Sequence, residues 1–102
     1  MKLTQGRRIT WQEAETLGNI QPGDYWYDPR HCWYAACPVP KDEDGFPLLA
    51  ALGQHSITEH EDGTITVSPS ILVGGNYPNS PKEWAEKHTW HGFLEHGVWR
   101  EC

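Results

Sequence analysis

Ile65-Thr66-Val67-Ser68-Pro69-Ser70-Ile71-Leu72-Val73 carries the strongest structural signal in this chain of 102 residues. Its odd positions are apolar, and every even position except Leu72 carries a hydroxyl group. Successive side chains of a β-strand point to opposite faces, so this alternation predicts a strand with one apolar and one hydroxylic face. Pro69 is counted here with the apolar face.

The segment before this strand supplies its hairpin partner. A two-residue turn at Asp62-Gly63 would put Ile57 on the wrong face. A three-residue loop, Glu61-Asp62-Gly63, instead aligns Ile57 with the apolar face of the next strand. We therefore expect the longer loop, with Gly63 in the left-handed conformation that closes it.

The same loop form recurs near the end of the sequence. Glu95-His96-Gly97 separates Trp90–Leu94 from Val98–Glu101, which predicts a second three-residue hairpin loop. That register places Leu94 opposite Val98. It also gives two further cross-strand pairs, Phe93 with Trp99 and His91 with Glu101.

An earlier hairpin joins Tyr25-Trp26-Tyr27 to Cys32-Trp33-Tyr34, because Pro29 suits the second position of a turn over Asp28–His31. The segment Leu48–Leu52 fits either a helix or a strand. These aromatic segments point side chains to both faces, so we expect a sheet that is covered on both sides.

Two capping boxes predict short helices. Thr10 with Glu13 and Ser80 with Glu83 each place a hydroxyl three residues before a carboxylate, so that the two side chains satisfy backbone donors at the helix start. The first helix is expected to stop at Gly18, and the second runs to about residue 87. The chain is thus expected to be a single domain over residues 1–102.

The composition indicates a small core rich in aromatic rings. The mass is 11.7 kDa, and six Trp and four Tyr compensate for a low content of Leu, Ile, Val and Phe. We expect a mainly β (α+β) fold: a compact antiparallel β-hairpin sheet, or a small sandwich or roll, with two short helices.

Charge and hydropathy exclude two classes of partner. Eight Lys and Arg stand against 14 Asp and Glu, a net charge of −6, which argues against direct nucleic-acid binding. No apolar run approaches the roughly 18 residues that a membrane span needs. The odd count of three Cys suggests no disulfide framework, so we expect a cytoplasmic protein without an export signal.

Three motifs resemble an uncharacterised family of small tailed-phage and prophage proteins: Pro22-Gly23-Asp24-Tyr25-Trp26, then Pro69-Ser70-Ile71, then His91-Gly92-Phe93-Leu94 before Gly97-Val98. The resemblance spans roughly residues 22–100. It implies a phage or prophage accessory protein and assigns no chemistry. Some members carry a Cys-rich, metal-like insert between the first two motifs, where this chain has Pro38–Gly53.

A metal-binding interpretation rests on His31, Cys32 and Cys37. The two cysteines have four residues between them, and residues five apart on a regular strand point to opposite faces. Buried cysteines and a surface histidine are the simpler interpretation, and we expect no cofactor. A small metal-binding domain stays an alternative.

A catalytic interpretation uses Ser70, His60, His91 and Glu101, since a hydroxyl, an imidazole and a carboxylate are the parts of nucleophilic catalysis. No nucleophile elbow, phosphate loop or metalloprotease helix accompanies them. A solvent-facing sheet explains the same residues, so the sequence favours a protein that is not an enzyme.

Binding is the function that the sequence favours. Aromatic rings dominate interfaces, and a net negative surface suits a basic partner. The candidate residues are Trp26, Trp33, Trp90, His91, Asp42, Glu43, Asp44, Glu61 and Asp62. The expected partner is a host or phage protein, for example a host defence factor that the domain inhibits.

A small nucleotide is the alternative ligand, to be sequestered or hydrolysed. Its base would stack on the rings, and its phosphates would meet Arg7, Arg8, Arg30 or Arg100. The sequence leaves the oligomeric state open.

Overall fold

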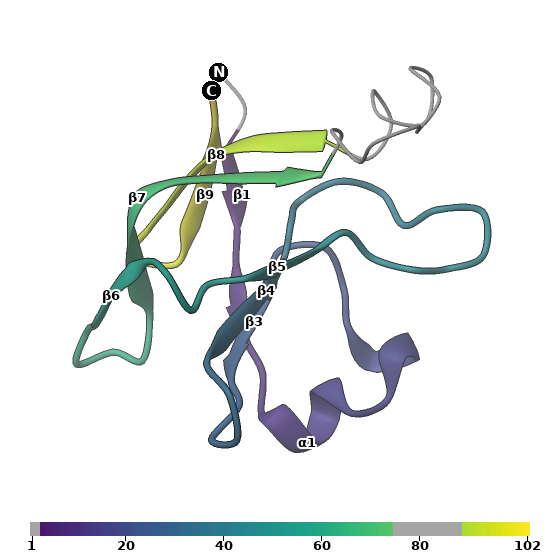
Figure 1. The fold of residues 1–102 in the computed structure, drawn as a ribbon, viewed down its shortest axis with the longest axis horizontal. Coiled ribbons are helices and arrows are strands. Elements are labelled where there is room, and N and C mark those ends of the chain that lie inside the picture. The colour runs from purple at the N-terminus through teal and green to yellow at the C-terminus, as the bar shows by residue number, and fades with distance from the viewer. Residues whose placement is uncertain (1–2, 75–88) are drawn as a thin grey trace.

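The computed structural model describes residues 3–74 and 89–102, which form two β-sheets with little helix (Figure 1). The larger sheet contains, in spatial order, β1 (Leu3–Gln5), β9 (Val98–Glu101), β8 (Thr89–Glu95), β7 (Ile65–Gly74) and β6 (Ser56–Glu59). The smaller sheet contains β2 (Arg7–Arg8), β3 (Asp24–Tyr27), β4 (Trp33–Ala36) and β5 (Leu49–Ala51). The predicted mainly β class is confirmed.

The β6–β7 hairpin has the predicted register. Ile57 pairs with Val67, and the His60 N–H donates to the Thr64 carbonyl oxygen at 2.8 Å, which leaves three residues in the loop. Gly63 closes this loop with a φ of +86°, a conformation that costs glycine little. The apolar face is buried as expected at Ile65 and Val67.

The second half of β7 departs from the regular alternation. Val67 pairs with Leu94 and Ile71 with Gly92, so three residues of β7 lie opposite one residue of β8. Such an insertion bends a strand and leaves residues out of the ladder. Pro69 lies in it and is exposed, so its predicted place on the apolar face is wrong.

The β8–β9 hairpin is tighter than predicted. Glu95 pairs with Val98, so the loop consists of His96 and Gly97 alone, with φ values of +47° and +75°. Positive φ at both positions is the signature of a type I′ turn, whose twist matches that of the flanking strands.

The shorter loop shifts every pair of this hairpin by one residue. Trp99 lies opposite Leu94, and Arg100 lies opposite Phe93. The predicted pairs of Leu94 with Val98, Phe93 with Trp99 and His91 with Glu101 are therefore wrong. A shift of one residue moves a side chain to the other face, and it brings Trp99 to the core beside Leu94.

The β3–β4 hairpin is confirmed. Tyr27 pairs with Trp33, and the His31 N–H donates to the Asp28 carbonyl oxygen at 3.0 Å, as a turn over Asp28–His31 requires. The ambiguous segment Leu48–Leu52 forms the strand β5 at its centre, paired with β4.

The N-terminal segment links the two sheets, as the purple trace in Figure 1 shows. β1 pairs with β9 in the larger sheet, and β2 pairs in parallel with β3 in the smaller sheet. Between them, the Gly6 N–H donates to the Gly97 carbonyl oxygen at 2.8 Å. A Cβ at Gly6 would lie 2.6 Å from that oxygen, so glycine is required at this close approach.

The predicted capping box of the first helix is confirmed. The Glu13 N–H donates to the Thr10 hydroxyl, and the Glu13 carboxylate accepts from the Thr10 N–H, both at 3.1 Å. The helix α1 covers Trp11–Ala14 and ends before the predicted stop at Gly18, which lies in a separate 3-10 turn, η1 (Leu17–Asn19). The second predicted helix, from Ser80 to about residue 87, lies outside the described residues.

Two apolar clusters hold the described residues together. The larger lies between the sheets and contains Trp90 and Trp99, whose rings meet edge to face at a centroid distance of 5.2 Å. The smaller lies between α1, η1 and the smaller sheet, around Ile20 and Trp26. Aromatic side chains thus supply much of the core, as the composition indicated.

Candidate functional site

The tryptophans expected on a binding surface lie mostly in the core. Trp26 is 6% exposed and Trp90 is 2% exposed, so neither ring contributes to a surface. Trp33 is half-buried: the Arg8 guanidinium lies 5.0 Å from its ring centroid, and Tyr27 packs on it at 5.4 Å. The predicted exposure of Trp26 and Trp90 is therefore wrong. Other large apolar side chains are exposed instead.

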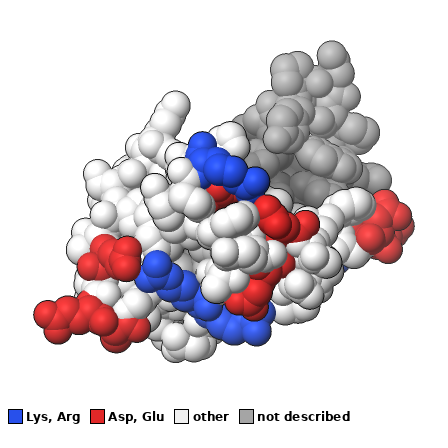
Figure 2. Space-filling view, turned by 90° about the horizontal axis from the view of Figure 1, so that it is seen from below, with Lys and Arg blue, Asp and Glu red and all other residues white. Residues whose placement is uncertain are grey.

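The acidic candidates divide between two loops. Asp42, Glu43 and Asp44 lie in the β4–β5 loop, which projects at the right in Figure 1, whereas Glu61 and Asp62 lie in the β6–β7 loop at the left. Figure 2 shows acidic side chains at both ends of another face. The acidic candidates therefore lie in two separate loops at opposite ends of the described structure.

The β4–β5 loop is shaped by one carboxylate. Asp42 Oδ1 accepts from the N–H groups of Asp44 and Phe46 at 2.9 and 2.8 Å, and the Asp42 N–H donates to the Phe46 carbonyl oxygen at 3.0 Å. The side chains of Glu43 and Asp44 take no part in these bonds and make no ion pair with a described residue. Lys41 is the basic residue of the same loop.

Phe46, which was not among the predicted site residues, belongs to the same loop and has 52% of its surface exposed. Its position directly after the Asp44-Gly45 turn signal was the available clue, since residues after a solvated turn are often lifted away from the core. We call Lys41–Phe46 the acidic loop. It combines an exposed ring with carboxylates that make no ion pair with a described residue.

The β6–β7 loop uses its carboxylate internally. Asp62 Oδ1 accepts from the Thr64 hydroxyl at 2.6 Å and from the Thr64 N–H at 3.0 Å. These bonds lower the pKa of Asp62, and positive charge on His60 and His96 adds a smaller effect in the same direction.

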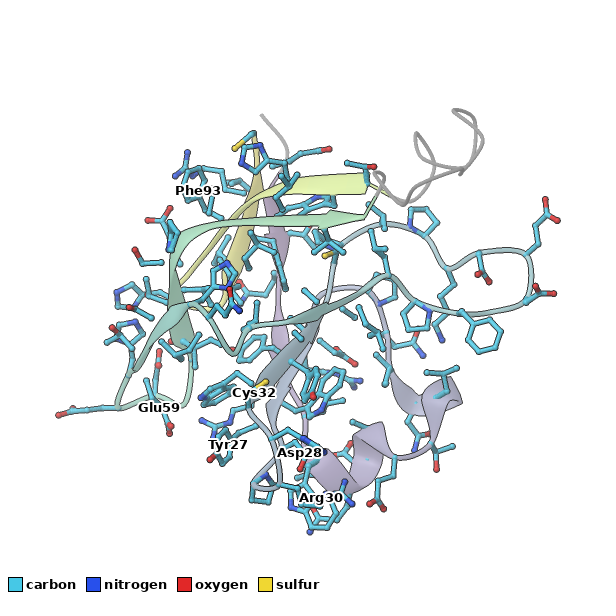
Figure 3. All side chains as sticks on the ribbon, viewed as in Figure 1. Tyr27, Asp28, Arg30, Cys32, Glu59 and Phe93 are labelled. Carbon is cyan, nitrogen blue, oxygen red and sulfur yellow. The ribbon has the colours of Figure 1, made fainter. Side chains whose placement is uncertain are left out.

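The four arginines are all engaged with carboxylates. Arg7 forms a bidentate pair with buried Asp24, at 3.1 and 2.9 Å. Arg8 pairs with Glu59, and Arg100 pairs with Glu95. Arg30 contacts both Asp28 and Glu15. Figure 3 shows one of these pairs, Asp28 and Arg30, at the tip of the β3–β4 hairpin. A nucleotide phosphate would have to compete with an internal carboxylate for any of these guanidinium groups.

The hydroxylic face predicted for β7 is the outer face of the larger sheet, and it carries two separate histidine contacts. His60 Nε2 lies 2.7 Å from the Thr66 hydroxyl, and its ring stacks on His96 at a centroid distance of 3.7 Å. This stack joins the two hairpin loops of the sheet. It lies away from the other catalytic candidates, because Thr66 precedes the β7 insertion and Ser70 is the last residue of that insertion.

Ser70 and His91 do come together. His91 Nε2 lies 3.1 Å from Ser70 Oγ and 4.0 Å from Cys102 Sγ, and all three side chains lie at the surface or close to it. Glu101 instead pairs with Gly92, and no described carboxylate bonds to His91. A nucleophile and a base are thus adjacent, without the acidic group that orients the base in a catalytic triad.

The three metal-ligand candidates differ in exposure and in the contacts they make. His31 is exposed, whereas the Cys32 thiol donates to the Trp33 carbonyl oxygen at 3.3 Å. Cys37 is fully buried in the larger cluster, and burial raises the pKa of its thiol to about 12. Across residues 3–74 and 89–102, no three His, Cys, Asp or Glu side chains are placed to share a metal ion.

The described part of the chain contains no helix with the length and apolar character of a membrane span. Comparison with protein-family models, with curated proteins and with solved structures finds no match to this chain.

Proposed function

We propose that the protein acts by non-enzymatic binding of a basic protein, and that the acidic loop is its contact surface. One contrast carries this proposal. The arginines are all paired with carboxylates, whereas Glu43 and Asp44 make no ion pair with a described residue and share their loop with an exposed phenylalanine ring. Aromatic side chains are enriched at the centre of protein interfaces, and charged side chains belong to the polar rim around them.

The shape of the loop also favours binding. Asp42 holds the backbone of the turn through two hydrogen bonds, so the loop has less conformational freedom to lose when a partner docks. The charges of Glu43 and Asp44 would accelerate encounter with a basic surface and orient it, and Phe46 would supply buried apolar area.

The resemblance to small phage proteins directs the choice of partner. A phage or prophage accessory protein acts inside an infected cell, so a host protein is the first class to test. A nucleic-acid-binding defence factor has the basic groove that an acidic loop could occupy and thereby inhibit. On this proposal, the protein works in the host cytoplasm.

A capture experiment tests the proposal. The immobilised full chain is incubated with bacterial lysate at about 0.1 M and about 1 M salt, and bound proteins are identified by mass spectrometry. We expect a basic protein that is retained at the lower salt and released at the higher one.

Three variants locate the contact. Glu43→Gln with Asp44→Asn removes the unpaired charge, and Phe46→Ala removes the ring while leaving the backbone bonds to Asp42 possible. Both should lose the partner. Glu61→Gln, a neutralised residue at the opposite tip, is the matched control and should retain it. Retention by the first two variants, or capture that does not depend on salt, would refute the proposal.

A further inference from the structure

The strand β5 has an edge that no other described strand covers. It lies at the end of the smaller sheet and pairs only with β4. The Cys37 N–H donates to the Leu48 carbonyl oxygen at 2.8 Å, and the Leu52 N–H donates to the Trp33 carbonyl oxygen at 2.9 Å. In an antiparallel ladder the bonded positions alternate, so residues 48, 50 and 52 face β4.

The backbone groups of Leu49 and Ala51 consequently point the other way. No hydrogen bond with a described residue engages their N–H or C=O groups. Both residues are exposed, which leaves this edge open to solvent. A row of unpaired backbone donors and acceptors is a template for an added strand.

A pocket of about 200 Å³ adjoins this edge, between β5 and the second half of β7. Its walls include Ala50, Leu52, Ile71 and Val73, and Leu72 at its rim is 66% exposed. An apolar cavity of roughly 150 Å³ accommodates a benzene ring, so this pocket has room for one aliphatic or aromatic side chain.

The facing edge of β7 already accepts a donor from outside the sheet. His55 Nε2 lies 3.2 Å from the Ser70 carbonyl oxygen, and because a carbonyl only accepts, the imidazole must be the donor. His55 also forms part of the pocket wall. No described residue makes a comparable hydrogen bond to the outer edge of β5.

We infer that an extended segment of the partner adds to β5 as an antiparallel strand. This inference rests on the proposed function. The residue opposite Ala50 would point inward, as Ala50 does, and enter the pocket. Antiparallel pairing brings the later part of the segment to the start of β5, which two residues separate from the end of the acidic loop. The partner segment is thus an alternating apolar strand followed by Lys or Arg.

Charge distinguishes this edge from that of β6 at the end of the larger sheet. The β6 edge carries Glu59, which is paired with Arg8, and it lies beside the opposite acidic tip. Within the described part of the chain, the β5 edge combines unpaired backbone groups, a pocket lined mainly by Leu, Ala, Ile and Val residues, and nearby carboxylates without an ion pair.

The test uses a displayed library of random ten-residue peptides, selected in parallel on the full-length parent and on variants. Ala51→Pro removes an N–H that the fold does not use and blocks the edge, so it should reduce the enrichment of the selected peptides about ten-fold. On the parent, we expect alternating apolar residues followed by basic ones. On Glu43→Gln with Asp44→Asn, the alternation should stay and the basic preference should disappear.

The outcomes separate the two proposals. Basic peptides that lack alternation and bind Ala51→Pro as well as the parent would overturn strand addition and leave the acidic loop as a binding surface. Alternating peptides without a basic preference would contradict the acidic loop. If no peptide is enriched on the parent, strand addition is also overturned.

A second measurement does not depend on the folding of Ala51→Pro. The most enriched peptide is synthesised with and without N-methylation of the residues that would pair with β5, and binding to the parent is measured by fluorescence anisotropy. Strand addition predicts that N-methylation weakens binding about ten-fold or more, because it removes backbone donors. Equal affinity of the two peptides would overturn it.

Discussion

The indole Nε1–H of Trp99 donates a hydrogen bond of 2.9 Å to the carbonyl oxygen of Gly23. Trp99 belongs to β9 in the larger sheet, and Gly23 directly precedes β3 in the smaller one. The bond therefore crosses the core and connects the two sheets at a fully buried site. It also satisfies the polar group of the ring, which would be costly to bury unpaired.

Replacement of Trp99 should cost much of the stability. Trp99→Ala removes a fully buried ring, and we expect a loss of about 3–5 kcal/mol in the free energy of unfolding, measured by urea denaturation. Trp99→Phe should cost less, because it keeps an aromatic ring and because the Arg7 N–H still reaches the Gly23 oxygen at 3.3 Å.

Phe93→Ala is the control for this experiment. Phe93 projects from the outer face of the larger sheet, under the Arg100 guanidinium at 4.4 Å from its centroid (Figure 3). Since it is half-exposed, its truncation should cost clearly less than that of Trp99. Equal losses for the two variants would contradict the observed assignment of faces.

Gly92→Ala should be strongly destabilising. A Cβ at Gly92 would lie 2.3 Å from the Arg100 carbonyl oxygen and 2.4 Å from the Trp90 ring, and neither the backbone nor a core indole can easily move. Overpacking of this kind costs about 1–3 kcal/mol or more. The melting temperature of Gly18→Ala is the comparison, because nothing lies within 4 Å of a Cβ there. A Gly92→Ala protein as stable as Gly18→Ala would show that the Trp90 ring lies elsewhere.

The three cysteines should differ in reactivity towards a thiol-specific disulfide reagent. Cys102 is exposed and should react first, and half-buried Cys32 should react later. Cys37 should react only after unfolding, even at pH about 9, because burial raises its pKa to about 12. Peptide mapping identifies each site, and Cys102→Ser should abolish the fast phase. Modification of Cys37 in the native protein would contradict its burial.

Acid should weaken the turn between β3 and β4. The Asp28 carboxylate accepts two hydrogen bonds of 3.1 Å from the Arg30 guanidinium and one of 2.9 Å from the Arg30 backbone N–H. These bonds lower the pKa of Asp28. A lowered pKa stabilises the folded state above the ordinary value of about 3.9. That stabilisation is lost as the pH falls through the lower pKa of the folded protein.

The difference in unfolding free energy between the parent and Asp28→Asn measures this effect. We expect it to be largest at neutral pH and to shrink as the solution becomes acidic. Asp44→Asn replaces a carboxylate with no ion pair among the described residues, and its difference from the parent should change less with pH. A constant difference for Asp28→Asn would exclude the ionised carboxylate as the stabilising group.

Local patterns were sufficient where neighbouring residues set the geometry. The three-residue loop before Thr64, the turn at Pro29 and the capping box at Thr10 were all predicted, because each depends on side chains within a few positions of one another. The β8–β9 loop was not predicted, because His96 adopts a positive φ that glycine reaches more easily. The shorter loop places Phe93 and Trp99 on opposite faces of the sheet, whereas the predicted register put them on the same face.

The candidate site was harder to predict, because exposure is a property of the whole fold. Trp90 and Trp26 share a residue type with many interface anchors, yet packing between layers buries them. The β1–β2 segment was missed as well. The segment is mostly polar and too short to show a periodic pattern. Its two strands form by pairing with β9 and β3.

The sequence by itself determined that this chain forms β-hairpins around aromatic rings, because it alternates apolar and hydroxylic residues and carries clear turn signals. Its surplus of acidic residues also determined that the surface carries negative charge. The tertiary structure alone decided which rings are buried, which carboxylates remain unpaired and which strand keeps an open edge. The reason is that local preferences act between neighbours in sequence. Burial and edge pairing depend instead on how the two sheets meet, through contacts such as that of Trp99 with Gly23.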